Sequence, residues 1–246
     1  MGEGTCVIVQ ARMGSTRLPG KVLREINGRP LIHHVIERLK SCRKVEEIIL
    51  AIPDKKDDDV LEAYAEKGGL GCFRGSEDDV LARYYGAAKA FCLRRIVRVT
   101  ADCPFVDPRL VDSLVDVFRK KKVDYAAIGV EGSFPRGLDA EIFDFETLEK
   151  AHFEARRDYE REHVTPYLYE NAKFFEALFL EAVGKLRRPD LRLTVDTPED
   201  LTLAREIFNG LGDRGLFYAE DIVDFLDTNP RLLSINDFVK QKKLGE

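Results

Sequence analysis

Three cations, two glycines and two hydroxyl side chains lie close together near the N-terminus, directly after a short apolar run from 5 to 9. The stretch from 10 to 21 reads QARMGSTRLPGK. Backbone N–H groups and hydroxyls can approach phosphate oxygens closely, and Arg and Lys side chains neutralise their charge. We therefore expect Arg12, Arg17 and Lys21 to bind the polyphosphate of a nucleoside triphosphate. A basic surface loop is the alternative, but three cations this close repel one another unless an anion lies among them.

This loop does not match the Walker A pattern of phosphate-binding loops. Five residues, and not four, separate Gly14 from Gly20. Val22 stands where a Ser or Thr would bind magnesium, and the next helical pattern begins near Pro30 and not at the lysine. The sequence therefore predicts a different kind of phosphate site.

Two aspartates each follow an apolar run that is typical of a buried strand. Asp102 comes after the run 95–100, and Asp196 comes after the run 191–195. Magnesium prefers one or two carboxylates together with substrate phosphates. We expect Asp102 and Asp196 to bind a divalent metal, although either one could simply cap a helix or close a turn.

Four polar residues between 129 and 190 are surrounded by apolar neighbours: Arg136, Asp139, Glu141 and His163. Side chains of these types can bind a hydroxyl-rich or anionic substrate, so we take them as candidate acceptor-binding residues. A structural role is an equally good interpretation for each of them, and for His163 in particular.

Apolar runs and helical periodicity alternate along the first 120 residues. Strands are expected at 5–9, 47–52, 72–75 and 95–100, and helices after Pro30, at 57–67, after Ser76 as N-cap, and after Asp107 as N-cap. Repeated strand–helix units give a mainly parallel sheet covered by helices on both faces, with ligands beyond the carboxyl ends of the strands. Arg12 and Asp102 both follow such ends, so we expect them to share a site.

The regular alternation of strands and helices ends after residue 125. We expect short strands at 126–130 and 141–143, a helix at 145–157 and an exposed hairpin at 174–182, and together 129–190 is interpreted as an inserted lobe. Thr197 and Pro198 have the pattern of a helix N-terminus, and the tail from 219 to 241 predicts two short helices divided at Asn229-Pro230. The expected organisation is one domain, 1–246, with this lobe inserted.

The composition narrows the class of partner. The chain has 246 residues, of which 34% are charged, and a formal net charge of −5, which argues against a nucleic-acid partner. Five scattered cysteines without a Cys-x-x-Cys pair favour a reducing cytoplasm over a disulfide framework. No apolar run is long enough to span a membrane.

Seen together, these motifs resemble the cytidylyltransferases that activate acidic sugars, such as the acylneuraminate and Kdo enzymes, and most closely the branch of the spore coat polysaccharide biosynthesis protein F. The first motif, 11–21 followed by Gly-Arg-Pro-Leu at 28–31, carries most of the specificity. The other matching segments lie at 73–81, 100–105, 135–139, 160–167 and 193–200. They span most of the chain.

The resemblance implies a Rossmann-like nucleotidyltransferase fold, a three-layer α/β/α sheet with an inserted hairpin and helix lobe. It also implies CTP as donor, Mg²⁺ as cofactor and a homodimer built through the lobe. It places the triphosphate on Arg12, Ser15, Arg17 and Lys21, and the base near Gly75 and Ser76. Gly14 and Arg74 belong to the same two motifs and are counted with the nucleotide-binding residues. Arg12, Arg17, Lys21 and Asp102 are the expected catalytic residues.

The expected reaction is transfer of CMP from CTP to a sugar or sugar-acid acceptor, with release of pyrophosphate. Such a displacement depends on positioning and charge neutralisation more than on covalent chemistry. Three alternatives stay open: CTP-dependent activation of a small phosphate ester, a glycosyltransferase that uses a nucleotide sugar, and a nucleotide-binding protein without turnover.

Overall fold

The computed structural model describes residues 4–130, 132–212 and 215–241. Within these ranges the strands are β1 (Thr5–Gln10), β2 (Glu25–Ile26), β3 (Arg29–Pro30), β4 (Glu47–Pro53), β5 (Gly71–Gly75), β6 (Arg95–Thr100), β7 (Tyr125–Ile128), β8 (Ala140–Asp144) and β9 (Ala177–Phe179). The strands expected in the first 100 residues are all confirmed.

The α-helices of the described residues are α1 (Leu31–Lys40), α2 (Asp59–Gly68), α3 (Val80–Ala90), α4 (Pro108–Lys121), α5 (Phe145–Glu154), α6 (Asp158–His163), α7 (Pro166–Glu170), α8 (Pro198–Leu211) and α9 (Ala219–Thr228). Short 3-10 turns occupy Lys21–Leu23, Lys56–Asp58, Gly184–Leu186 and Pro230–Ile235. Asp107 caps α4 and Thr197 caps α8, each followed by proline at the first helical position, as the sequence predicts.

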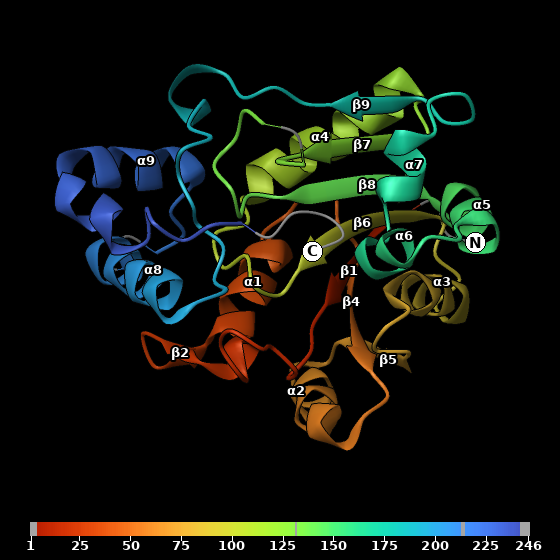
Figure 1. The fold of residues 1–246 in the computed structure, drawn as a ribbon, viewed down its shortest axis with the longest axis horizontal. Coiled ribbons are helices and arrows are strands. Elements are labelled where there is room, and N and C mark those ends of the chain that lie inside the picture. The colour runs from red at the N-terminus through yellow and green to blue at the C-terminus, as the bar shows by residue number, and fades with distance from the viewer. Residues whose placement is uncertain (1–3, 131, 213–214, 242–246) are drawn as a thin grey trace.

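The described strands other than β2 and β3 form one sheet in the order β5-β4-β1-β6-β8-β7-β9 (Figure 1). The first four strands of this order are parallel, and β8 is antiparallel to both of its neighbours. In the parallel part, Gln10 at the end of β1 is level with Thr100 at the end of β6. This register brings the loops after β1 and β6 to the same edge of the sheet.

Helices cover both faces, so the expected three layers are confirmed. Val7 and Val9 of β1 pack in a core with residues of α1, α2, α4, α8 and α9. Ile8, which points to the other face, packs in a second core with α3 and α5. In Figure 1, α8 and α9 lie at the opposite side of the molecule from α3 and α5. Strand alternation explains this division, because successive side chains point to opposite faces.

Two expectations about the region after residue 125 are wrong. The segment 174–182 does not form a hairpin: it contributes the single edge strand β9, which is parallel to β7. The N–H of Asp124 donates to the carbonyl of Glu176, and the N–H of Glu176 donates to the side-chain carboxylate of Asp124, which brings the chain back to that edge. In addition, β8 lies in the central sheet between β6 and β7, and not in a separate lobe. A local apolar pattern predicts that a strand forms but not which strand lies beside it, which explains both errors.

Two local expectations also need correction. Ser76 does not cap α3: Asp79 does, by accepting from the backbone N–H of Ala82 at 2.8 Å, while Ser76 accepts from the backbone N–H of Asp79. The run 191–195 is not a strand of the sheet. Its backbone pairs with Arg136 through an isolated bridge, and the N–H of Val195 donates to the carbonyl of Asp102 at 2.8 Å. Asp196 therefore follows an extended crossing segment, not a central strand.

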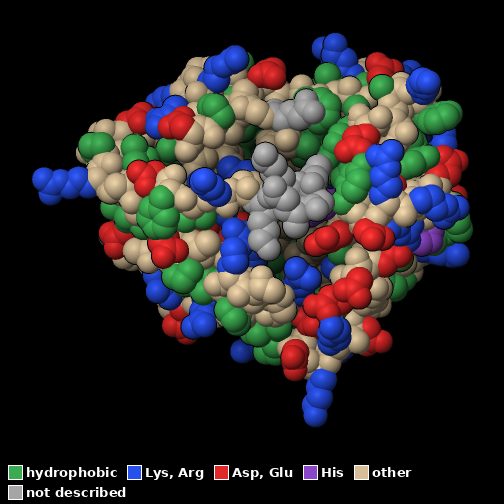
Figure 2. All heavy atoms as spheres, in the orientation of Figure 1, with side chains coloured by type: hydrophobic (Ala, Val, Ile, Leu, Met, Phe, Trp, Pro, Cys, Tyr) green, Lys and Arg blue, Asp and Glu red, His purple; other side chains and the backbone are tan. Residues whose placement is uncertain are grey.

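On the face shown in Figure 2, Lys and Arg side chains are interspersed with Asp and Glu, as the high charged fraction suggests. All five cysteines are free in the structure. No helix in the described part of the chain is both long and apolar enough to cross a membrane.

Candidate active site

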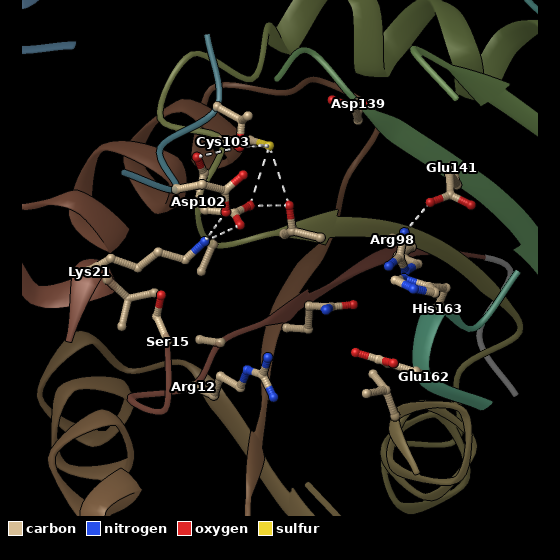
Figure 3. A pocket seen from close by; sticks show the side chains of 18 of the residues that line it. Arg12, Ser15, Lys21, Arg98, Asp102, Cys103, Asp139, Glu141, Glu162 and His163 are labelled. Atoms are coloured by element: carbon tan, nitrogen blue, oxygen red, sulfur yellow. Dashed lines mark hydrogen bonds and ion pairs between the residues drawn. The ribbon is translucent and has the colours of Figure 1, made fainter. Parts of the chain in front are cut away.

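A pocket of about 460 Å³ opens at the carboxyl ends of β1 and β6, on the face of the sheet that α3 and α6 cover (Figure 3). Most of the residues singled out from the sequence line it: Arg12, Ser15, Arg17, Lys21, Asp102, Arg136, Asp139, Glu141, His163 and Asp196. The chain therefore brings together the predicted phosphate loop, both aspartates and the candidate acceptor residues. This is the arrangement that the doubly wound sheet predicted.

The loop after β1 is held by its backbone and by two apolar anchors. The carbonyl of Met13 accepts from the N–H groups of Ser15 and Gly20, and the N–H of Met13 donates to the buried carboxylate of Asp58 at 2.8 Å. Leu18 and Val22 are buried in the core. These contacts leave the polar side chains of the loop free to face the pocket.

Lys21 forms ion pairs with both of the predicted metal ligands, Asp102 and Asp196. Its Nζ lies 2.6 Å from Oδ2 of Asp102 and 2.7 Å from Oδ1 of Asp196, although these residues are 81 and 175 positions away in the sequence. Burial alone would raise the pKa of Asp102. The charge and hydrogen bond of Lys21 outweigh burial and lower that pKa to about 2. The Asp102 carboxylate is thus held ionised beside Lys21.

Each aspartate is oriented by its own neighbours. The hydroxyl of Thr100 donates to Oδ1 of Asp102 at 2.5 Å. Oδ2 of Asp196 lies 2.7 Å from Nη2 of Arg192 and 3.1 Å from Nη2 of Arg17. Two carboxylates that converge on one cation suit Mg²⁺, with the remaining ligands supplied by phosphate oxygens and water. Among the described residues no group of three or more His, Cys, Asp or Glu forms a fuller metal site.

The other half of the pocket contains the candidate acceptor residues. The Arg136 guanidinium lies 3.9 Å from Asp139, and its side chain is 42% exposed, so this pair is loose. Asp139 also accepts from the backbone N–H of Gly137, and burial raises its pKa. Burial lowers the pKa of His163, which favours its neutral form. Hydroxyl groups and one anionic group would find partners here.

Glu141 is part of a buried network that the sequence did not reveal. It pairs with Arg98 of β6, and it accepts from the hydroxyl of Tyr125 at 2.8 Å. In Figure 3, Arg98 and Glu141 point toward each other across neighbouring strands. The sequence feature that could have indicated this network was Arg98, a charged residue within an apolar strand and on the same face as Ile96 and Thr100. Arg192 was also missed, and its spacing four residues before Asp196 and eight before Asp200 was the only hint.

Gly14, Arg74, Gly75 and Ser76 are not among the residues that line this pocket. The Arg74 side chain is held on the outer surface by Asp54, Asp59 and Glu62. The turn that contains Ser76 adjoins the pocket, because the backbone carbonyl of Ser76 accepts a hydrogen bond from Arg83, and Arg83 lines the pocket. Binding of the base by this group stays a prediction.

The comparison with known families decides the class of protein. A family model described as cytidylyltransferase matches residues 6–241, which is nearly the whole chain. The chain belongs to the cytidylyltransferase family. It is therefore an enzyme of the CTP-dependent nucleotidyltransferase class, and the pocket described above is its candidate active site.

Individual members of the family are similar over most of their length. The spore coat polysaccharide biosynthesis protein SpsF of Bacillus subtilis is 36% identical over 228 residues, which cover 91% of this chain and 94% of the relative. A 3-deoxy-manno-octulosonate cytidylyltransferase of Anaeromyxobacter dehalogenans is 26% identical over 82% of this chain and 96% of the relative. The resemblance inferred from the motifs is confirmed.

The fold comparison agrees. The solved structure of a cytidylyltransferase from Leptospira borgpetersenii has a TM-score of 0.87 and 32% identity, and the match covers 97% of this chain and 98% of that chain. The nucleotidyltransferase fold expected from the sequence is therefore confirmed, with the sheet order given above.

Proposed function

We propose that this cytidylyltransferase transfers CMP from CTP to a hydroxyl group of a sugar or sugar acid and releases pyrophosphate. The observation that carries the proposal is the meeting of Lys21, Asp102 and Asp196 in the same pocket as Arg136 and Glu141. One half of this pocket suits a triphosphate and a metal, and the other half suits a polar acceptor. The names of the relatives support a role in making activated sugars for surface polysaccharides.

In this mechanism the chain contributes binding and charge neutralisation. Arg12, Ser15 and Arg17 bind the triphosphate, and Lys21 moves from the carboxylates to the phosphate oxygens as CTP enters. The acceptor hydroxyl oxygen attacks the α-phosphorus in line and gives up its proton to solvent. The bond between the α-phosphorus and the oxygen that bridges it to the β-phosphorus breaks, and this oxygen leaves with pyrophosphate. Positioned cations stabilise the charge that develops on the departing pyrophosphate.

Charge balance is the argument for a divalent cofactor. Lys21 and Arg17 are already balanced by Asp102 and Asp196, so these four side chains offer no net positive charge to a triphosphate. We propose that Asp102 and Asp196 hold Mg²⁺ with CTP. When bound, the ion would neutralise the α-phosphate and favour attack there.

The acceptor half favours an acidic sugar. Arg136 is half-exposed and only loosely paired, so its guanidinium is available to a carboxylate, while Asp139, Glu141 and His163 would meet hydroxyl groups. The same guanidinium also suits a phosphate, which keeps a small phosphate ester as the second candidate acceptor. We further propose a cytoplasmic homodimer, on the resemblance alone.

A screen of the four nucleoside triphosphates against acidic sugars, neutral sugars and small phosphate esters tests the proposal. The expected result is pyrophosphate release that requires CTP, Mg²⁺ and an acidic sugar. A glycosyltransferase would release none. Activity confined to phosphate esters would replace the proposed acceptor class, and activity with another triphosphate would replace CTP.

Asp102→Asn is the matching variant. It keeps the size of the side chain but removes the charge that faces Lys21 at 2.6 Å. We expect turnover to fall by more than about 100-fold, because even changes in the groups that merely orient metal ligands cost about 10- to 100-fold. Circular dichroism should show an intact fold. Asp57→Asn, at an exposed site outside the pocket, is the control. Unchanged activity with Mg²⁺ in the Asp102 variant would remove this residue from the mechanism.

A further inference from the structure

Arg192 is a largely buried cation that the proposed mechanism does not use. Its side chain is 9% exposed. Nη2 donates to Oδ2 of Asp196 at 2.7 Å, on the carboxylate oxygen opposite the one that contacts Lys21. Arg192, together with Arg17 at 3.1 Å from the same oxygen, therefore holds Oδ2 and leaves Oδ1 of Asp196 turned toward Asp102.

The orientation of the Arg192 guanidinium is itself fixed from other directions. Nε and Nη2 form a forked contact with the two oxygens of Asp200, at 2.9 and 3.1 Å, and Nη1 donates to Oε1 of Gln241 at 2.6 Å. Asp200 is completely buried, and one of its oxygens also accepts from the backbone N–H groups of Asp196 and Thr197. Because all three of its nitrogens donate hydrogen bonds, the planar guanidinium group of Arg192 has little freedom to rotate.

The C-terminal segment, residues 229–241, completes this arrangement. The side-chain amide of Asn236 donates to the carbonyl of Arg192 at 3.0 Å and to Oδ1 of Asp200 at 2.8 Å. The 3-10 turn Pro230–Ile235 has no buried residue, and a cavity of about 220 Å³ lies between it and the segment 190–193. Polar contacts to Arg192 and Asp200 thus hold the segment in place, together with Leu232, Leu233 and Ile235, which are partly buried against the core.

We propose that Arg192 is a positioning residue for Asp196, and that the C-terminal segment acts on the active site through it. Arg192 holds Oδ2, so Oδ1 stays directed toward Asp102 and available to a metal ion that arrives with CTP. The inference rests on the proposed role of Asp196 in the cytidylyl transfer described above. Asn236 and Gln241, which are 44 and 49 positions downstream of Arg192, would in this way influence the affinity of the site for its metal.

The test measures metal binding without turnover. Mn²⁺ is titrated into the protein in the presence of α,β-methylene CTP, and free Mn²⁺ is followed by electron paramagnetic resonance. Arg192→Ala should weaken Mn²⁺ binding about 10- to 100-fold, as is typical when a residue that orients a metal ligand is lost. Guanidinium ion added to this variant should restore part of the affinity. Asn236→Ala should give a smaller loss, and Lys240→Ala, an exposed neighbour in the same segment, should give none.

A purely structural role would change the melting temperature but not the Mn²⁺ dissociation constant of the folded protein. Equal Mn²⁺ affinity in wild type and folded Arg192→Ala overturns the inference, and so does a wild type that binds no Mn²⁺ with the analogue. If Arg192→Ala does not fold, Arg192→Lys replaces it, since lysine keeps the charge but cannot form the fork. Binding that depends on Arg192, in a protein that never releases pyrophosphate, would support the inference and count only against the proposed transfer.

Discussion

In the function proposed above, the side chains of this pocket form an anion-binding half and an acceptor-binding half. In the first half, Lys21 and Arg17 contact the Asp196 carboxylate. A metal ion would compete for the carboxylate, and a triphosphate would compete for the two cations. In the second half, Arg98 is neutralised by Glu141, while Arg136 is only loosely paired. A cation that already has a close partner gains less from a new anion than one that does not. The preference of the enzyme for a negatively charged acceptor should therefore depend on Arg136.

Arg136→Ala tests this dependence. The variant should raise the KM for an acidic acceptor about 10-fold or more, because a charge-assisted contact is lost, while the KM for CTP changes little. Steady-state kinetics with each substrate varied in turn give both constants. Arg187→Ala, which removes an exposed arginine outside the pocket, is the control. An effect confined to the KM for CTP would assign Arg136 to the nucleotide half.

At the scale of elements, the site depends on the contact between two irregular segments. The loop that carries Arg136 pairs with the segment before Asp196: the carbonyl of Arg136 accepts from the N–H of Leu193 at 2.7 Å. Gly137 makes the approach possible. Its φ is +99°, and a Cβ at this position would lie 2.4 Å from the backbone nitrogen of Thr194. No side chain can be accommodated there without moving one segment away from the other.

Gly137→Ala should therefore affect both stability and activity. We expect the free energy of unfolding to fall by about 3 kcal/mol, from the unfavourable φ and the backbone clash together. Turnover should fall as well, because Asp196 follows the displaced segment. Gly69→Ala is the matched control: its φ is +63°, but a Cβ there meets nothing within 4 Å, so a loss of only about 1 kcal/mol is expected. Urea unfolding gives the free energy of unfolding of both variants. Equal decreases in the two would show that the close approach of the backbones at Gly137 contributes nothing.

At the scale of the whole molecule, all four histidines have their pKa values lowered, and burial is the largest cause for each. A lowered pKa means that the unfolded chain binds protons before the folded protein does. The unfolded state therefore gains protons first as the pH falls through about 6.5, and the folded state loses relative stability. Above that pH the histidines are neutral in both states and contribute nothing to this difference.

The free energy of unfolding should accordingly decrease between pH 7.5 and pH 5.5. His34 is the best single probe: it packs on Phe208 with ring centroids 4.2 Å apart, and its Nε2 lies 2.8 Å from the carbonyl of Ile26. His34→Gln should flatten the slope by at most about 1.4 kcal/mol per pH unit, the value for one proton. Urea unfolding at several pH values gives the slope. A stability that rises toward pH 5.5 would contradict the prediction.

The sequence by itself determined the local features of this protein. The loop from Arg12 to Lys21, the strands that precede it and Asp102, and the helix starts at Pro108 and Pro198 follow from residue types at short spacing. Such signals are local: caps, turns and apolar periodicity act within a few residues. Because the carboxyl ends of parallel strands share an edge, the meeting of Arg12 and Asp102 could also be predicted.

Tertiary structure alone decided which groups touch. The insertion of β8 between β6 and β7 pairs Arg98 with Glu141. The crossing of segment 191–195 places Asp196 beside Lys21, and Arg192 contacts the other oxygen of Asp196. These partners come from elements whose order in the sheet is not their order in the chain. The periodicity of a strand tells which face of it is buried but not which strand lies next to it, so the partners of a buried charge stay undetermined until the sheet is assembled.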